Sequence, residues 1–123
     1  MMKYGNFKAT TSDGVTHDSR REARRWSHLQ LLLKAGEISD LQRQVPYELI
    51  PAQYETFERY GKKGQRLKDG KRCIERGVDY YADFVYIENG KQVVEDAKGV
   101  RTDDYIIKRK LLLWIHKIRI KEV

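Results

Sequence analysis

Cysteine, proline and long apolar runs are all scarce in this sequence. Its 123 residues include one cysteine, Cys73, and two prolines. One cysteine excludes an internal disulfide and a cysteine-based zinc site, and it favours the reducing cytoplasm as the location. No apolar run is long enough to span a bilayer, and residues 1–7 lack the apolar core of a signal peptide. We therefore expect a cytoplasmic protein without a membrane partner.

Negative charge is also in short supply. The chain has 25 Lys and Arg against 18 Asp and Glu, a formal net charge of +7. Positive potential attracts polyanions, so nucleic acid is the first partner to consider and an anionic membrane surface the second. A hydrophobic fraction of 40% suits one globular domain spanning residues 1–123.

Local patterns predict that helices and strands are mixed along the chain. A short hairpin is expected at residues 3–17, around the turn dipeptide Asp13-Gly14. Ser19 followed by Glu22 is a capping-box signature for a helix reaching about residue 35. Strands are expected at residues 45–50 and 117–123, and a second helix begins near Thr102 or Asp103. These elements predict an α/β fold, with a mixed central β-sheet flanked by helices.

Residues 51–77 show no clear period. Between residues 59 and 76 there are eight Lys or Arg and only two acids. We interpret the segment as a mobile basic insertion loop that contacts nucleic acid. The alternative is a solvated, disordered loop without a function. If it contacts nucleic acid, the residues expected to neutralise phosphates are Lys62, Lys63, Arg66, Lys68, Lys71 and Arg72.

The strongest local signal lies at residues 79–98. Two runs rich in β-branched and aromatic residues flank Asn89-Gly90, which predicts a hairpin with a type I′ turn. In that register Asp83 faces Asp96, and Lys98 lies on the same face. Glu95 points to the other face.

Two directly opposed carboxylates have Cβ atoms about 4.5–5.5 Å apart and repel each other. A divalent cation would compensate, because Mg²⁺ commonly binds through one or two carboxylates plus substrate phosphate. Lys98 is placed to hold an attacking water or to stabilise charge that builds up on phosphorus. The pattern predicts metal-assisted phosphodiester chemistry.

Asp83 followed by Asp96-Ala97-Lys98 resembles the signature of the PD-(D/E)XK nuclease superfamily. Glu22 matches, in position and order, the acidic residue that the first core helix of that family often supplies. Tyr81-Ala82 precedes Asp83 where the family name expects Pro. The resemblance covers roughly residues 3–115. The whole pattern is similar to small phage-encoded endonucleases, including those that resemble Holliday junction resolvases, and it includes Gly36-Glu37-Ile38, Leu41-Gln42-Arg43-Gln44 and Lys98-Gly99.

The resemblance implies a metal-dependent DNA endonuclease with a restriction-endonuclease-like core. Asp83, Asp96 and Glu22 would hold Mg²⁺ or Mn²⁺, and Lys98 would align or activate the water. Branched DNA is then the expected substrate, cut by a homodimer, in the host cytoplasm if the protein is phage-encoded. The alternatives are a general or nicking nuclease, a non-catalytic basic nucleic-acid-binding protein, and a ribosome-associated protein.

Several single residues have two explanations. Glu22 is explained equally well as the glutamate of the capping box. Gln44 either helps to position substrate or water, as the resemblance implies, or is a plain strand residue. Lys108 and Lys110 either contact phosphate or lie on a solvated helix face. His17, His28 and His116 have no metal-ligand spacing and are expected to be surface or core residues.

Overall fold

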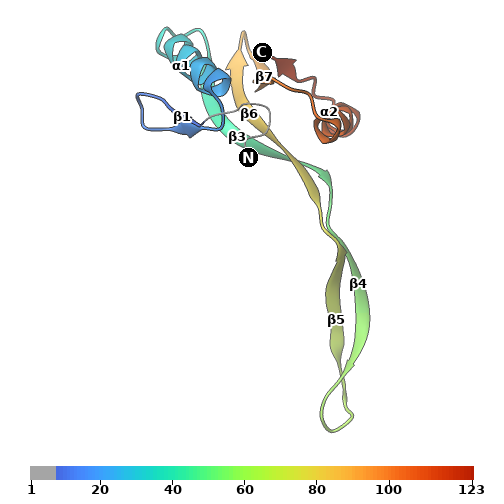
Figure 1. Cartoon of the computed structure of the whole chain (residues 1–123). Helices are drawn as coiled ribbons and strands as arrows, with labels where there is room; N and C mark the ends of the chain where they lie inside the picture. The colour runs from blue at the N-terminus through green and yellow to red at the C-terminus, as the bar shows by residue number, and fades with distance from the viewer. Residues whose placement is uncertain (1–7) are drawn as a thin grey trace.

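The structure, a computed structural model, describes residues 8–123. Of the hairpin predicted at residues 3–17, the part before residue 8 lies outside the described residues. Figure 1 shows a body built from a sheet and two helices, with a long ribbon that projects from it. The elements are β1 (Ala9–Thr10), β2 (Thr16–His17), α1 (Arg20–Lys34), β3 (Ser39–Ile50), β4 (Gln53–Tyr60), β5 (Arg66–Glu75), β6 (Val78–Glu88), β7 (Lys91–Asp96), α2 (Asp103–His116) and β8 (Lys121–Glu122).

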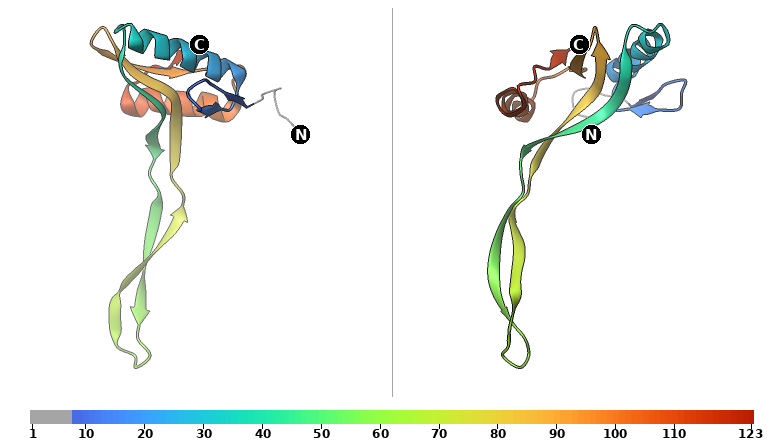
Figure 2. Two further views of the ribbon diagram at one scale, coloured as in Figure 1. Left: turned by 90° about the vertical axis from the view of Figure 1, so that its left-hand side faces the viewer. Right: turned by 180° about the vertical axis from the view of Figure 1, so that it is seen from behind.

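The central sheet has four strands in the order β3-β6-β7-β8. Strand β6 is antiparallel to both β3 and β7, whereas β8 runs parallel to β7, so the sheet is mixed. Helices α1 and α2 lie on opposite faces of this sheet (Figures 1 and 2). The predicted α/β fold, one domain with a mixed sheet flanked by helices, is confirmed.

Each face of the sheet buries its own apolar cluster. Trp26 and Leu29 of α1 pack against Phe84 and Tyr86 of β6. On the opposite face, Tyr105 and Leu112 of α2 pack with residues of β3, β6 and β7. Both helices begin at predicted caps, because the hydroxyls of Ser19 and Thr102 accept hydrogen bonds from the N–H groups of Glu22 and Tyr105.

The predicted turn at Asn89-Gly90 is confirmed. Both residues have positive φ angles, 53° and 74°, as a type I′ turn requires. Glu88 pairs with Lys91 and Phe84 with Glu95, which is the register expected from a two-residue turn. The predicted last strand is shorter than expected, because only Lys121 and Glu122 of the tail pair with β7.

Side chains do not simply alternate along β3 and β6. Ala82 packs in the cluster under α2, whereas Phe84 packs in the cluster under α1. On β3, Leu41 packs on the α1 side and Val45 on the α2 side, and Gln44 between them has a left-handed φ of 53°. Both strands therefore change faces beside Asp83.

The basic segment at residues 51–77 is not the mobile loop that the sequence predicted. Strands β4 and β5 pair in antiparallel fashion and form a ribbon that leaves the body (Figure 2). Residues 51–77 show no clear period in sequence because the segment is a strand pair with solvent on both faces. We call residues 53–75 the arm. Within residues 8–123, no helix is long and apolar enough to cross a membrane.

Candidate active site

The hairpin brings Asp83 of β6 beside Asp96 of β7, as its register predicts. Asp96 is 1% exposed, and its carboxylate interacts directly with that of Asp83. A hollow of about 250 Å³ opens next to this pair and is lined by Glu22, Asp83 and Lys98, among others. The four residues expected from the sequence, Glu22, Asp83, Asp96 and Lys98, are therefore gathered around one place.

Asp96 is held firmly but is incompletely satisfied. One of its oxygens, Oδ2, accepts a hydrogen bond from the buried Tyr80 hydroxyl. The other, Oδ1, is buried and accepts no hydrogen bond from the described residues, although Lys98 Nζ lies 3.4 Å away. A buried carboxylate oxygen without a hydrogen bond is destabilising unless a cation satisfies it.

Glu22 and Gln44 complete the acidic side of the hollow. Glu22 is 5% exposed even though it lies in the first turn of α1. Its Oε1 accepts a hydrogen bond from Gln44 Nε2 at 3.2 Å and lies 3.5 Å from His17 Nδ1. The same Gln44 amide also donates to Asp83 Oδ1 at 3.3 Å. Gln44 thus bridges two carboxylates. The Glu22 N–H takes part in the helix cap by donating to the Ser19 hydroxyl, while the Glu22 carboxylate contacts Gln44 and His17.

The local charge raises the pKa of Asp83 to about 8. Burial is the largest cause, followed by the hydrogen bond and negative charge of Asp96 and the charge of Glu22. The Ala97 N–H, which donates to Asp83 Oδ2 at 3.0 Å, works in the opposite direction. Three acids crowd this hollow, so it favours the binding of positive charge.

Lys98 is supported from the side of α2. Its Nζ lies 4.5 Å from the centre of the Tyr105 ring, a cation–π contact. The Tyr105 hydroxyl donates to Glu122 Oε2 at 2.7 Å, and Arg101 pairs with the same carboxylate at 3.0 Å. Burial and then the Glu122 contact raise the pKa of Tyr105, so its hydroxyl stays protonated and Lys98 keeps a fixed aromatic neighbour.

The donor set fits a divalent cation in part. Within the described residues, no three His, Cys, Asp or Glu side chains are arranged as a complete metal-binding group. The Glu22 carboxylate contacts Gln44 and His17, and the Gln44 amide connects it to Asp83. The aspartate pair itself fits Mg²⁺, which often takes one or two carboxylates and completes its shell with water and substrate phosphate. The buried, unbonded Oδ1 of Asp96 is the atom that such an ion would satisfy.

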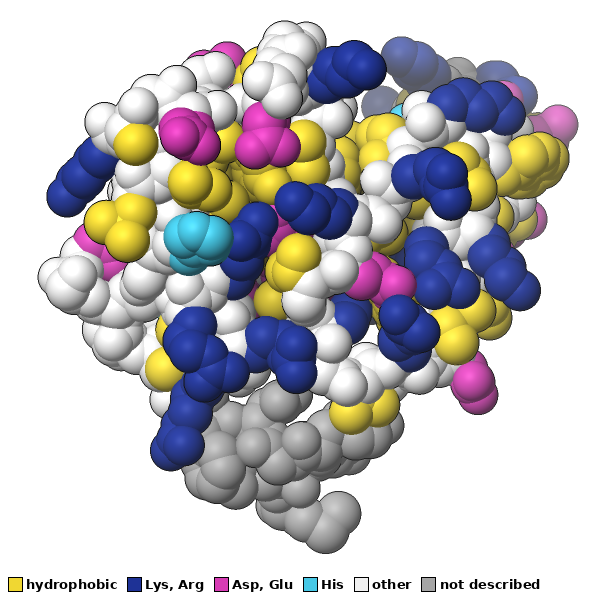
Figure 3. All heavy atoms as spheres, turned by 90° about the horizontal axis from the view of Figure 1, so that it is seen from above, with side chains coloured by type: hydrophobic (Ala, Val, Ile, Leu, Met, Phe, Trp, Pro, Cys, Tyr) yellow, Lys and Arg dark blue, Asp and Glu magenta, His cyan; other side chains and the backbone are white. Residues whose placement is uncertain are grey.

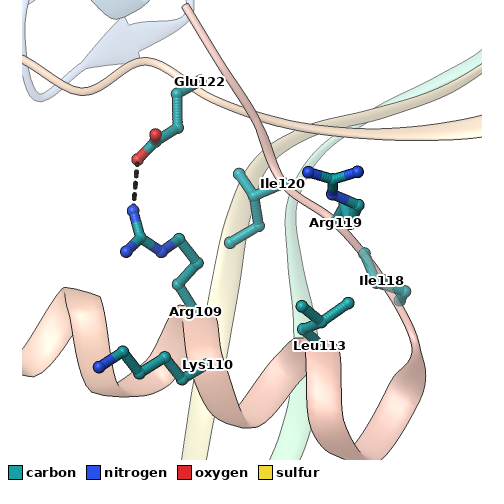
Figure 4. Close-up of a pocket in the computed structure, with 7 residues that line it drawn as sticks. All are labelled: Arg109, Lys110, Leu113, Ile118, Arg119, Ile120 and Glu122. Carbon is teal, nitrogen blue, oxygen red and sulfur yellow. Dashed lines mark ion pairs between the residues drawn. The ribbon is translucent and has the colours of Figure 1, made fainter.

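The predicted nucleic-acid-binding residues lie on two elements, the arm and α2, which carries Lys108 and Lys110, and none of them lines the hollow beside the acids. The six in residues 62–72 are exposed on the arm. Lys110 lines a second groove, of about 360 Å³, between α2 and the chain leading to β8 (Figure 4). Its one carboxylate, Glu122, pairs with Arg109 at 3.6 Å. Lys and Arg are also spread over the end of the body away from the arm (Figure 3).

Glu95 lies on the opposite face of the hairpin from the acids, as predicted. Arg25 of α1 contacts it through two nitrogens, with Nη2 at 2.9 Å from Oε2, and the Tyr86 hydroxyl also donates to Oε2. Glu95 is fully buried. This ion pair ties α1 to the sheet and takes no part in the hollow.

Sequence reasoning missed the supporting residues His17, Tyr80 and Tyr105. The sequence indicated a surface or core position for His17, and no sequence pattern assigned Tyr80 or Tyr105 to the site. Each contacts a site residue from a distant part of the chain, so no local spacing reveals it. The N–H of Ala97 was also missed, although its place in Asp96-Ala97-Lys98 put it beside the acids.

A family model described as "Protein of unknown function (DUF1064)" matches residues 1–121. No curated protein and no solved structure matches the chain. Because the family model spans nearly the whole sequence, the chain belongs to the DUF1064 family.

Proposed function

We propose that this protein is a metal-dependent DNA endonuclease with a restriction-endonuclease-like core. The observation that supports this most is the convergence of Asp83, Asp96 and Lys98, with Asp96 Oδ1 buried and without a hydrogen bond. Structural ion pairs satisfy their oxygens, as Glu95 does with Arg25 and Tyr86. Surplus negative charge beside a lysine suits an ion and a phosphate instead.

Asp83 and Asp96 would hold Mg²⁺ or Mn²⁺, and Glu22 would add negative charge through Gln44. When bound, the cation supplies a Lewis acid for the scissile phosphate. Tyr80 fixes one oxygen of Asp96, while the Ala97 N–H and Gln44 fix Asp83. These contacts hold the acids in place before substrate arrives.

Lys98 orients the attacking water and stabilises charge in the transition state. Its side chain is 29% exposed, so the ammonium reaches the hollow while the Tyr105 ring supports it. The water gives up a proton to solvent as it forms a bond to phosphorus, one backbone P–O bond breaks, and the leaving oxygen takes a proton from solvent. A positioned donor of this kind contributes about 100-fold or more to the rate.

We propose branched DNA as the substrate and a homodimer as the active form, because a junction is resolved by two cuts. Residues 8–123 form one small body and the arm, and a body of this size favours recognition of DNA shape. Sedimentation of the protein alone and with a four-way junction tests the dimer. A monomer in both conditions would contradict junction resolution.

Cleavage of a four-way junction and of a matched linear duplex, each with Mg²⁺, Mn²⁺ or EDTA, tests the activity. Asp96→Asn keeps the side-chain size and is expected to abolish cleavage while leaving the protein folded. Asp79→Asn, at an exposed position of the neighbouring strand β6, is the control and should cleave like wild type.

Metal-dependent cutting of the junction alone, lost in Asp96→Asn, supports the whole proposal. Equal cutting of both substrates supports the nuclease activity but contradicts selectivity for junctions, and it favours a general or nicking nuclease. Binding without cleavage in any metal contradicts the nuclease and favours a non-catalytic nucleic-acid-binding protein.

A further inference from the structure

The arm carries its charge unevenly. Its distal residues, 59–72, include seven Lys or Arg and one acid, whereas residues 53–58 and 73–75 include three acids and no base. All seven basic side chains are exposed. Arg66 and Arg72 pair with Asp69 and Glu55. In the part of the chain described, no acid pairs with Arg59, Lys62, Lys63 or Lys68.

Cross-strand stacking stiffens the ribbon, although it has no apolar core. Phe57 lies over Gly70, where an added Cβ would come within 2.2 Å of the ring. The Arg72 guanidinium lies over the Phe57 ring, 4.3 Å from its centre, and Lys71 lies 4.2 Å from the centre of the Tyr54 ring. These contacts hold the basic tip, where Lys62 and Lys63 form the turn, away from the body (Figure 1).

Both long edges of the arm are unpaired, because β4 and β5 form a sheet of two strands only. An isolated two-stranded ribbon is marginally stable in water, and its free edges invite a partner. A second copy of the arm is a poor partner, since the two distal halves would repel each other. A polyanion is the partner that the charge favours.

We propose that the arm enters the major groove of a DNA duplex one to two helical turns from the candidate active site. This inference rests on the proposed function. The major groove of B-DNA, about 12 Å wide, admits a two-stranded β-ribbon. The eight residues of β4 span about 26 Å at about 3.3 Å each, and the seven residues between β5 and Asp83 add about 23 Å. One turn of duplex is about 34 Å long, so the body and the tip hold the duplex at two points that lie one to two turns apart.

The inference is tested by binding, measured in EDTA so that no cleavage occurs. Fluorescence anisotropy compares duplexes of about 10 and about 30 base pairs, below and above the length that two contacts one to two turns apart require. The arm variant combines Lys62→Ala, Lys63→Ala and Lys68→Ala. The control combines Lys34→Ala, Lys91→Ala and Lys121→Ala, three exposed lysines of the body with the same total charge.

We expect the arm variant to bind the long duplex about tenfold or more weakly than wild type, with a salt slope smaller by about 2–3. It should bind the short duplex like wild type, and the control should change little on either. A second variant replaces residues 53–75 by Asn-Gly between Ala52 and Arg76, which the register of β3 with β6 places opposite each other. This variant should also bind the long duplex no more tightly than the short one.

Equal weakening by the arm variant and the control would overturn the inference. So would tight binding of an RNA duplex of the same sequence, since its deep, narrow major groove excludes the ribbon. Cleavage separates the two proposals. If binding depends on duplex length but no cleavage occurs, the arm's role in binding is supported and the nuclease activity is contradicted. If the protein cleaves DNA but neither binding nor cleavage changes in the arm variants, the nuclease activity is supported and the arm's role is contradicted.

Discussion

Replacing Asp83 by Asn is expected to stabilise the metal-free protein at neutral and alkaline pH. Asn is uncharged, has nearly the same size, and still accepts from the Ala97 N–H through its remaining oxygen. In wild type, burial and then the neighbouring acids raise the pKa of Asp83 from 3.8 to about 8. The folded state therefore holds a proton that the unfolded state releases.

The sign follows from this proton count. Below pH 3.8 both states are protonated and Asp83 is not penalised. As pH rises toward 8, the unfolded chain binds fewer protons than the folded one, so the free energy of unfolding falls. Each pH unit in this window costs about 1.4 kcal/mol, an upper limit of about 6 kcal/mol in total. Because Asp96 shares the proton and the hollow is open to water, we expect the free energy of unfolding to fall by about 2 kcal/mol over this window.

Urea or thermal unfolding in EDTA, from about pH 4 to pH 8, measures the difference. Asp83→Asn should match wild type at the acid end and unfold about 6–10 °C higher at the alkaline end. The exposed control Asp79→Asn should show no pH-dependent gain. A variant that is equally or less stable than wild type at every pH would refute the surplus of negative charge in the hollow.

Three further results are expected. Mn²⁺ or Mg²⁺ should raise the melting temperature of wild type and have little effect on Asp83→Asn, because the ion needs both aspartates; equal shifts in the two proteins would contradict a metal at this pair. Lys98→Met should lower the cleavage rate about 100-fold while DNA affinity, measured by anisotropy, changes little; an unchanged rate would remove Lys98 from the mechanism. Arg25→Met should destabilise the fold by about 3 kcal/mol in urea, since it leaves Glu95 buried without its cation, and adding Glu95→Gln should recover most of the loss; no recovery would mean that packing rather than charge matters there.

The hairpin and the helix starts were predictable from sequence because their causes are local. Asn89-Gly90 sets the turn, and the turn sets which residues of β6 and β7 face each other. Capping by Ser19 and Thr102 needs only the next three residues. The hairpin register alone places Asp83 beside Asp96, so the centre of the candidate site could be predicted from the sequence.

The arm was not predictable as a ribbon, because both of its faces meet solvent. A strand with one buried face shows alternating polarity, and β4 and β5 have no core to impose it. Their cross-strand stacking, as between Phe57 and Arg72, joins residues too far apart in sequence to leave a spacing signal. The basic composition was visible, but the geometry that carries it away from the body was not.

What the sequence determined by itself was the set of acids on the hairpin, the lysine beside them and the excess of basic charge, since these depend on residue type and on a two-residue turn. Tertiary structure decided which distant groups complete the site. The left-handed backbone at Gln44 turns its amide between Glu22 and Asp83, and the packing of α2 places Tyr105 under Lys98. These contacts join separate elements, so they exist only once both faces of the sheet are covered and the strands have changed faces beside Asp83.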